Sequence, residues 1–223
     1  MRTSAAEIWH TVHDERRRLL ADLSGARPEQ WRTPSLCPGW DVHDVLAHLV
    51  DTARTGRLTF VRELLSARMD FDRANARGVT RERRADPLDT LAALTRVADL
   101  TRTPPAALAT RLVEAIVHGE DIRRPLGITG SYPDDAVAQA LTHQLKTPVS
   151  FGGGRERAAG LQLVDRRTGV TWGTGDAVEA ESLDLLLAVS GRPVDRERLR
   201  GSAADRLADA AQGRAGAHEE GER

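Results

Sequence analysis

Apolar residues recur at helical spacing in four long segments, and this periodicity limits the chain to a fold built mainly from helices. In the first segment, Ile8, Val12 and Leu19 fall on one face. Ser4 and Glu7 precede that stripe with the pattern of a capping box. The four predicted helices cover residues 4–24, 41–65, 86–100 and 104–122. Helices of this kind bury their apolar stripes against one another, so we predict a mainly α fold that begins with an antiparallel four-helix bundle.

Capping residues and prolines mark where these helices start. Asp41 precedes the second helix, and Asp86-Pro87 places a proline at the first helical position of the third. Thr103-Pro104-Pro105 repeats this signal for the fourth helix. Residues 69–85 are rich in Arg and Asp without apolar periodicity, which predicts a surface loop. A short fifth helix is predicted from about Pro133 to Leu145.

The character of the chain changes after Pro148. The glycine-rich stretch FGGGRERAAG follows, and it lacks the Lys-Ser/Thr ending of a phosphate loop, so nucleotide binding is not predicted there. LQLVD and TGVTW flank a turn signal and predict a β-hairpin, VEAES is a candidate third strand, and residues 183–189 predict an apolar helix. We predict a helical domain over residues 1–147, a small α+β domain over 148–211 and a disordered tail over 212–223, which is polar and rich in Gly.

Composition excludes several classes of function. The net charge is -1, so no overall field attracts nucleic acid, and the short Arg-rich runs at 16–18 and 81–84 are interpreted as solvated faces. Cys37 is the only cysteine, which excludes an intrachain disulfide and a Cys-rich metal site. No segment reaches the roughly 20 apolar residues of a membrane span, and no signal peptide is recognised, so we expect a cytoplasmic protein.

Arginine supplies nearly all the positive charge, since Lys146 is the only lysine. Codon bias in a GC-rich genome explains this preference. Recognition of carboxylates by the planar guanidinium fork is the alternative explanation, and the two explanations are compatible.

Glu114 and His118 form a candidate metal clamp in the fourth predicted helix. Their separation of four residues places them one above the other on a single helix face. Carboxylate oxygen and neutral imidazole both suit zinc, and His48, at the border of the apolar stripe of the second helix, is the candidate third ligand. A solvated surface pair at Glu114 and His118 and a structural role for His48 are the alternatives.

Two stretches of the chain resemble the mycothiol-dependent maleylpyruvate isomerase family. They are CPGWDVHDVLAHLV, which begins at Cys37, and RLVEAIVHGEDIRRPLG, which begins at Arg111. The resemblance covers roughly residues 1–145 and weakens after Pro193. It implies a DinB-like four-helix bundle, a small α+β C-terminal domain, and zinc or a similar divalent metal ion held by His48, Glu114 and His118.

The resemblance also implies an enzyme that uses mycothiol, the thiol of actinobacteria, as cosubstrate. The implied activity is cis–trans isomerisation of a maleylpyruvate-type substrate; a mycothiol S-transferase in detoxification or secondary metabolism, or a non-catalytic metal-binding module, are the alternatives. The expected partners are a small thiol and an electrophile that carries a carboxylate. Arg111 is the candidate substrate-binding residue, although a surface ion pair with Glu114 is equally compatible with its position. Asp121 is expected to orient His118 or to pair with Arg123 or Arg124, and Cys37 is expected to be structural.

Overall fold

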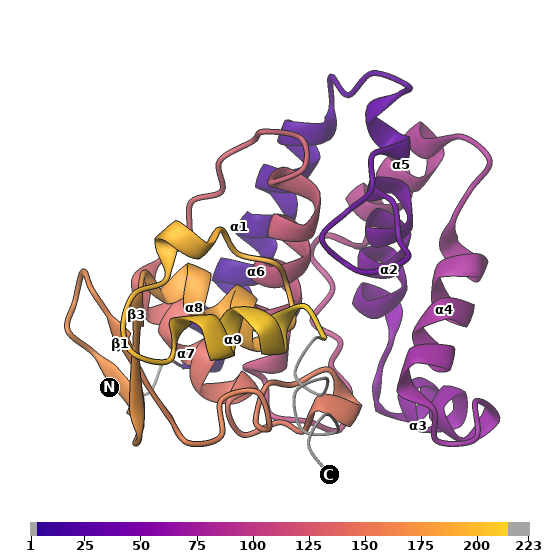
Figure 1. Ribbon diagram of the computed structural model, residues 1–223. Helices are drawn as coiled ribbons and strands as arrows, with labels where there is room; N and C mark the ends of the chain where they lie inside the picture. The colour runs from indigo at the N-terminus through magenta and orange to yellow at the C-terminus, as the bar shows by residue number, and fades with distance from the viewer. Residues whose placement is uncertain (1–3, 214–223) are drawn as a thin grey trace, which may run out of the picture. The chain divides into compact units, whose positions relative to one another are not determined.

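The computed structural model describes residues 4–213 and shows a mainly helical chain with a small sheet, as predicted (Figure 1). The helices are α1 (Ala5–Leu23), α2 (Val42–Arg54), α3 (Arg57–Ser66), α4 (Phe71–Glu82), α5 (Pro87–Val97), α6 (Thr110–Arg123), α7 (Asp134–Gln144), α8 (Ser182–Val189) and α9 (Ala204–Ala211). The strands are β1 (Leu161–Asp165), β2 (Thr171–Gly173) and β3 (Asp176–Ala180). None of the described helices combines the length and the apolar character needed to cross a membrane.

The chain divides into two compact units, Met1–Ala136 and Val137–Arg223. This division falls within α7, whereas the sequence led us to expect a boundary after residue 147. The expected boundary stays a prediction, because α7 contributes residues to both units. The predicted tail over 212–223 lies outside the described residues except for Gln212 and Gly213.

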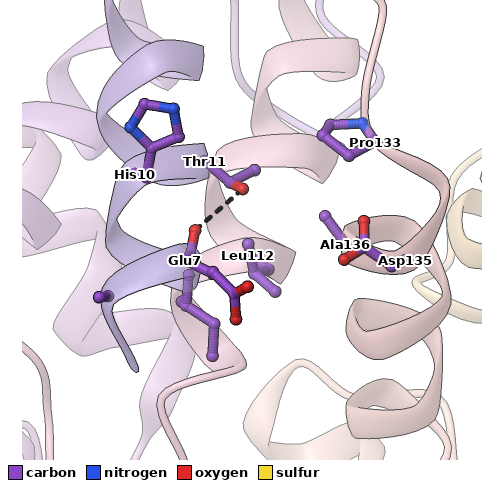
Figure 2. Close-up of a pocket in the computed structure, with 9 residues that line it drawn as sticks. Glu7, His10, Thr11, Leu112, Pro133, Asp135 and Ala136 are labelled. Carbon is purple, nitrogen blue, oxygen red and sulfur yellow. Dashed lines mark hydrogen bonds between the residues drawn. The ribbon is translucent and has the colours of Figure 1, made fainter. Parts of the chain in front are cut away.

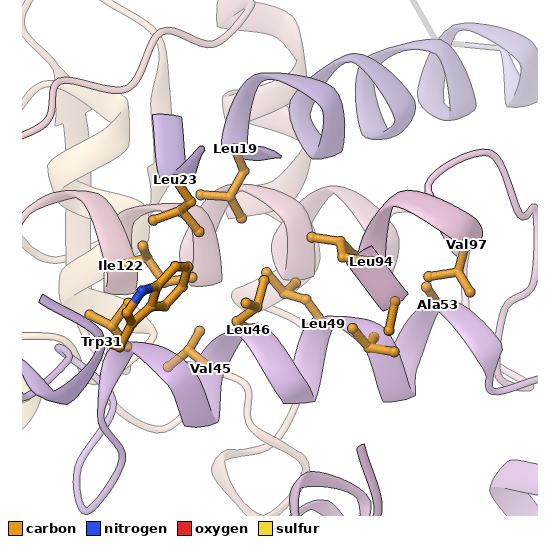
Figure 3. Close-up of a cluster of buried hydrophobic side chains, with 13 residues drawn as sticks. Leu19, Leu23, Trp31, Val45, Leu46, Leu49, Ala53, Leu94, Val97 and Ile122 are labelled. Carbon is orange, nitrogen blue, oxygen red and sulfur yellow. The ribbon is translucent and has the colours of Figure 1, made fainter. Parts of the chain in front are cut away.

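The first unit is built around a core shared by α1, α2, α5 and α6. Figure 3 shows Leu46 and Leu49 of α2 in this cluster, together with Leu94 of α5 and Ile122 of α6. Leu19 of α1 completes this part of the core, and all five side chains are buried. Because the burial of apolar surface is the main favourable term in folding, these contacts fix the helices that carry the polar site described below.

The second predicted helix is interrupted. Asp41 caps α2, as the sequence indicated, and forms a capping box with Asp44, but α2 ends at Arg54. Thr55 then has an extended backbone, and Gly56 precedes the first residue of α3. The single helix expected over 41–65 was therefore wrong, because apolar residues continue at helical spacing across a break in the backbone.

The surface loop predicted over residues 69–85 was also wrong, because α4 occupies most of it. Apolar periodicity does not detect this helix, since it is attached to α2 mainly through charged side chains. Arg54 donates to both carboxylate oxygens of Glu82 at 3.0 and 2.9 Å, and Arg81 pairs with Asp51 at 2.5 Å. Gly78 permits the close approach of the two helices, because a Cβ at this position would lie 2.3 Å from an oxygen of Asp51.

Asp70 caps α4, and its replacement is expected to destabilise the first unit modestly. Its side chain accepts a hydrogen bond from the backbone N–H of Arg73 at 2.9 Å. We expect Asp70→Ala to lower the free energy of unfolding by about 1 kcal/mol in urea denaturation, as for other N-cap residues. Asp70→Ser keeps a capping oxygen and is expected to stay close to wild type; equal losses in both variants would contradict the capping role.

The fourth predicted helix begins later than expected, at Thr110 instead of residue 104. Pro105 disfavours a helical backbone at Pro104, the residue before it. The segment that follows forms turns, in which Ala106 donates to the carbonyl of Pro104 at 2.8 Å and Thr110 donates to that of Ala107 at 3.0 Å. Despite this later start, Glu114 and His118 both lie within α6.

The second unit contains the predicted β-hairpin and a third strand. The sheet has the order β2-β1-β3, with β2 antiparallel and β3 parallel to the central strand β1. The carboxylate of Asp165, at the end of β1, accepts hydrogen bonds from Ser182 at 2.6 Å and Thr168 at 2.9 Å. These bonds tie the hairpin turn to the start of α8, the helix predicted from the apolar run over residues 183–189.

Candidate functional site

His48 lies near the middle of α2 and is almost fully buried. Its apolar neighbours Leu46 and Leu49 point into the core, which fixes the rotation of the helix about its axis. The indole ring of Trp40, just before the helix, lies 5.1 Å from the imidazole of His48 between ring centres. The Trp40 side chain therefore packs against the His48 ring.

His118 of α6 faces His48. The centres of the two imidazole rings are 4.7 Å apart, with an angle of 81° between their planes. Nδ1 of His118 lies 2.9 Å from Oδ2 of Asp121, whose side chain is fully buried. An ionised carboxylate only accepts hydrogen bonds, so this contact places the proton on Nδ1 and leaves Nε2 of His118 able to bind a metal ion or accept a proton.

Asp121 also connects α6 to the loop that contains Cys37. Its backbone carbonyl accepts a hydrogen bond from the N–H of Leu36 at 3.2 Å. The second sequence motif therefore contacts the residue that directly precedes the first motif. The structure shows the contact with His118, which is one of the two roles expected for Asp121.

Glu114, the third residue of the predicted metal site, contacts arginines. Its Oε2 lies 2.8 Å from Nη2 of Arg111, and its Oε1 lies 4.0 Å from Nη2 of Arg16. Within residues 4–213, no group of three or more His, Cys, Asp or Glu side chains is arranged to hold a metal ion. The structure thus brings His48 and His118 together, while Glu114 is bound to Arg111.

In this arrangement, His48 and His118 are placed to share a divalent metal ion, whereas the carboxylate of Glu114 is bound to Arg111. Zinc binds imidazole nitrogen at about 2.0–2.1 Å, so two imidazoles that share one zinc ion have ring centres roughly 5 Å apart. The 4.7 Å between His48 and His118 is compatible with that separation. Glu114 must exchange or share its arginine partner before all three residues can bind one ion.

Arg16 is a site residue that the sequence analysis missed. It belongs to the Arg-rich run at 16–18, which was interpreted as a solvated face, yet its side chain is only 3% exposed. Nη1 of Arg16 donates to the carbonyls of Ala98 and Leu100 at 3.1 Å, which anchors the side chain between α1 and the end of α5. Burial lowers the pKa of the Arg16 guanidinium, and the neighbouring Glu114 opposes that shift. The position on the α1 face of Ile8, Val12 and Leu19 was the only signal in the sequence.

His43, one turn before His48, takes no part in the histidine pair. Its Nε2 lies 2.8 Å from the hydroxyl of Thr90, and its ring meets the edge of Trp31 with 6.2 Å between ring centres. Burial, together with the nearby Arg83 cation, lowers the pKa of His43 to about 4. His43 is therefore a neutral structural residue at neutral pH.

An ionic network on the same helix fixes the orientation of α6. Arg123 is fully buried and donates to Glu15 of α1, to Asp22 at 2.7 Å and to the hydroxyl of Tyr132 at 2.9 Å. Gly119, which directly follows His118, is required at this crossing, since a Cβ there would lie 2.9 Å from atoms of both Arg123 and Glu15. The network thereby holds the turn of α6 on which His118 and Asp121 lie.

The hollow in Figure 2 lies away from the histidine pair. It has a volume of about 430 Å³ and is lined by the first turns of α1, by Leu112 of α6 and by the start of α7. Figure 2 shows His10 and Thr11 at its edge, and none of His48, Glu114 and His118 lines it. This hollow therefore adds no residue to the candidate site.

The fold and site define a helical bundle that holds a histidine pair next to an arginine-bound glutamate and is followed by a small α+β unit. Residues 12–102 match the family model described as the mycothiol maleylpyruvate isomerase N-terminal domain. This match confirms the resemblance stated from the sequence; the motif that begins at Arg111 lies beyond the matched range.

Solved structures support the same fold over nearly the whole chain. A crystal structure of mycothiol-dependent maleylpyruvate isomerase is 15% identical, with a TM-score of 0.62, and covers 91% of this chain and 94% of its own. The structure of a histidine-to-alanine variant of mycothiol-dependent maleylpyruvate isomerase is 13% identical, with a TM-score of 0.64 and the same coverage. At this level of identity the likeness shows the fold. A comparison with curated proteins found no match.

Proposed function

We propose that the chain is a metal-dependent and mycothiol-dependent enzyme that acts as a cis–trans isomerase on a maleylpyruvate-type substrate. The observation that carries the proposal is the contact between the buried His48 and the partly exposed His118, with Nδ1 of His118 held by Asp121. The domain family of residues 12–102 and the fold of the two solved isomerases support it.

His48, Glu114 and His118 are the proposed metal ligands. A divalent ion such as zinc, when bound there, would supply positive charge that keeps a small thiol ionised near neutral pH. Asp121 orients the imidazole ring of His118 through the hydrogen bond to Nδ1. Trp40 packs against the ring of His48 and restricts its orientation.

The proposed reaction is a reversible addition and elimination at a conjugated cis double bond. The thiolate sulfur forms a C–S bond, and the electron pair of the double bond moves onto the conjugated carbonyl. Rotation about the resulting single bond and elimination break the C–S bond, return the thiolate and give the trans isomer. Arg111 is proposed to bind a substrate carboxylate, because its planar guanidinium suits a carboxylate in two parallel hydrogen bonds.

Zinc analysis and thiol titration of the full chain test this proposal. We expect about one equivalent of zinc by elemental analysis, and saturable mycothiol binding by calorimetry that disappears when a chelator removes the metal. Maleylpyruvate and simple thiol-reactive electrophiles then separate the two activities: the trans product with mycothiol recovered supports isomerisation, and a stable thioether supports S-transfer. A zinc-loaded chain that binds no mycothiol and turns over none of these compounds would contradict an enzymatic role.

A further inference from the structure

Two buried guanidinium groups meet a single carboxylate beside the histidine pair. Arg16, Arg111 and Glu114 are 3%, 5% and 8% exposed. Arg111 contacts one carboxylate oxygen of Glu114 at 2.8 Å, and Arg16 lies 4.0 Å from the other. A buried charge is tolerated when it is paired, so two cations that share one anion favour the arrival of a second anion.

Both arginines retain unused hydrogen-bond donors that are shielded from water. Nη1 of Arg16 is bound to backbone carbonyls at the end of α5, and Nη1 of Arg111 donates to the carbonyl of Thr52 at 3.2 Å. Nη2 of Arg16 and Nε of Arg111 are buried and form no hydrogen bond within the described residues. Buried donors without an acceptor are unfavourable, and these two are fixed in place by the bonds on the other nitrogens.

We propose that Arg16 and Arg111 form a carboxylate-binding pair, which Glu114 occupies until a divalent metal ion recruits Glu114 and frees the pair for a carboxylate of the substrate. This inference rests on the metal site of the proposed function. It extends that function by adding Arg16 as a second substrate-binding residue and by making the Glu114 carboxylate an internal stand-in for the substrate.

The exchange of Glu114 between the arginines and the metal ion couples the binding of the metal ion to the binding of the external carboxylate. An external carboxylate competes with Glu114 for the guanidinium of Arg111, and a metal ion near two unscreened cations is destabilised by repulsion. Each ligand therefore lowers the cost of binding the other, and by linkage the effect is equal in both directions. The class of ligand is a small carboxylate, because the guanidinium fork matches its two oxygens.

Calorimetric titration of maleate, a cis-dicarboxylate, into the full chain tests the coupling. For the wild type, we expect maleate to bind at least tenfold more tightly when the protein is saturated with zinc than after treatment with a chelator. Zinc titrations in the presence and absence of maleate should show the same factor. Equal maleate affinity in the two states would overturn the proposal.

Substitutions separate the contributions of the three residues. Glu114→Gln is expected to bind maleate without zinc at least tenfold more tightly than the metal-free wild type, because the internal carboxylate is gone. Arg16→Gln is expected to weaken maleate binding at least tenfold in the zinc-loaded protein while zinc binds as tightly as before or more tightly. Arg62→Gln, which removes an exposed arginine of α3, is the matched control and should behave as wild type. Unchanged maleate affinity in Arg16→Gln would overturn the role of Arg16.

A second variant and the zinc titration of the wild type distinguish the remaining explanations. If Arg16→Gln does not fold, Arg16→Lys retains a cation at this position, and its maleate affinity is expected to fall while the zinc dependence persists; wild-type affinity would contradict a guanidinium-specific contact. Absence of zinc binding in the wild type would overturn the metal site and this inference together. Zinc binding without any effect on maleate would overturn this inference alone.

Discussion

Replacing His118 by alanine is expected to lower the zinc affinity of the chain by more than 100-fold. The substitution removes one of three proposed protein ligands and also leaves Asp121 without the imidazole that its carboxylate contacts at 2.9 Å. Loss of an outer partner of a metal ligand already costs about 10–100-fold in affinity, so loss of the ligand itself should exceed that range. Competition with a chromogenic chelator, together with elemental analysis, measures the change.

His10→Ala is the matched control for this prediction. His10 is 78% exposed on α1 and pairs with nearby Asp14 at 3.1 Å. We expect this variant to keep one equivalent of zinc and wild-type mycothiol binding. Stoichiometric zinc in His118→Ala, in a protein whose thermal unfolding resembles that of the wild type, would contradict the assignment of His118 as a ligand.

Elements with a one-sided apolar pattern and clear capping signals could be predicted from the sequence. The capping box at Ser4 and Glu7 and the stripe through Val12 and Leu19 correctly indicated α1. The turn signal between LQLVD and TGVTW correctly indicated the hairpin of β1 and β2. In these cases local backbone preference and burial favour the same structure, so one sequence is sufficient evidence.

Helices held by charge were not predictable in the same way. The sequence of α4 has few apolar residues, and its attachment to α2 depends on pairs such as Arg54 with Glu82, which are 28 residues apart. The burial of Arg16 has the same cause, because its backbone acceptors lie in the distant α5 region. Sequence periodicity predicts only which apolar residues are buried. A buried ion pair can be recognised only when the tertiary structure shows which residue is the partner.

The candidate site was likewise predictable from the sequence only in part. Spacing within one helix placed Glu114 and His118 together, and the position of His48 at the border of a buried stripe suggested that it faces another helix. The structure brings His48 to His118 but places Glu114 against Arg111 and Arg16. Which of several nearby charges a carboxylate contacts depends on distances of a few ångströms, and these are not encoded in residue spacing.

Replacing Arg123 by methionine is expected to destabilise the first unit by about 3–5 kcal/mol, the cost of removing one partner from a buried ion pair. Methionine keeps most of the apolar stem but leaves Glu15, which is 1% exposed, without its main cation. Arg17→Met is the matched control: it removes exposed ion pairs with Asp14 and Asp99, each of which is expected to contribute about 0–1 kcal/mol. Burial already raises the pKa of Glu15 in the wild type, with Arg123 opposing that shift, so the pKa should rise further in the variant.

A carboxyl group whose pKa is raised by folding stabilises the folded state below its unfolded pKa and loses that contribution as the pH increases. The deficit of Arg123→Met in urea denaturation should therefore be largest at pH 7 and shrink as the pH falls toward 4.5, the ordinary pKa of the glutamate side chain. A deficit that is small at pH 7, or independent of pH, would show that Glu15 does not depend on Arg123 for its burial.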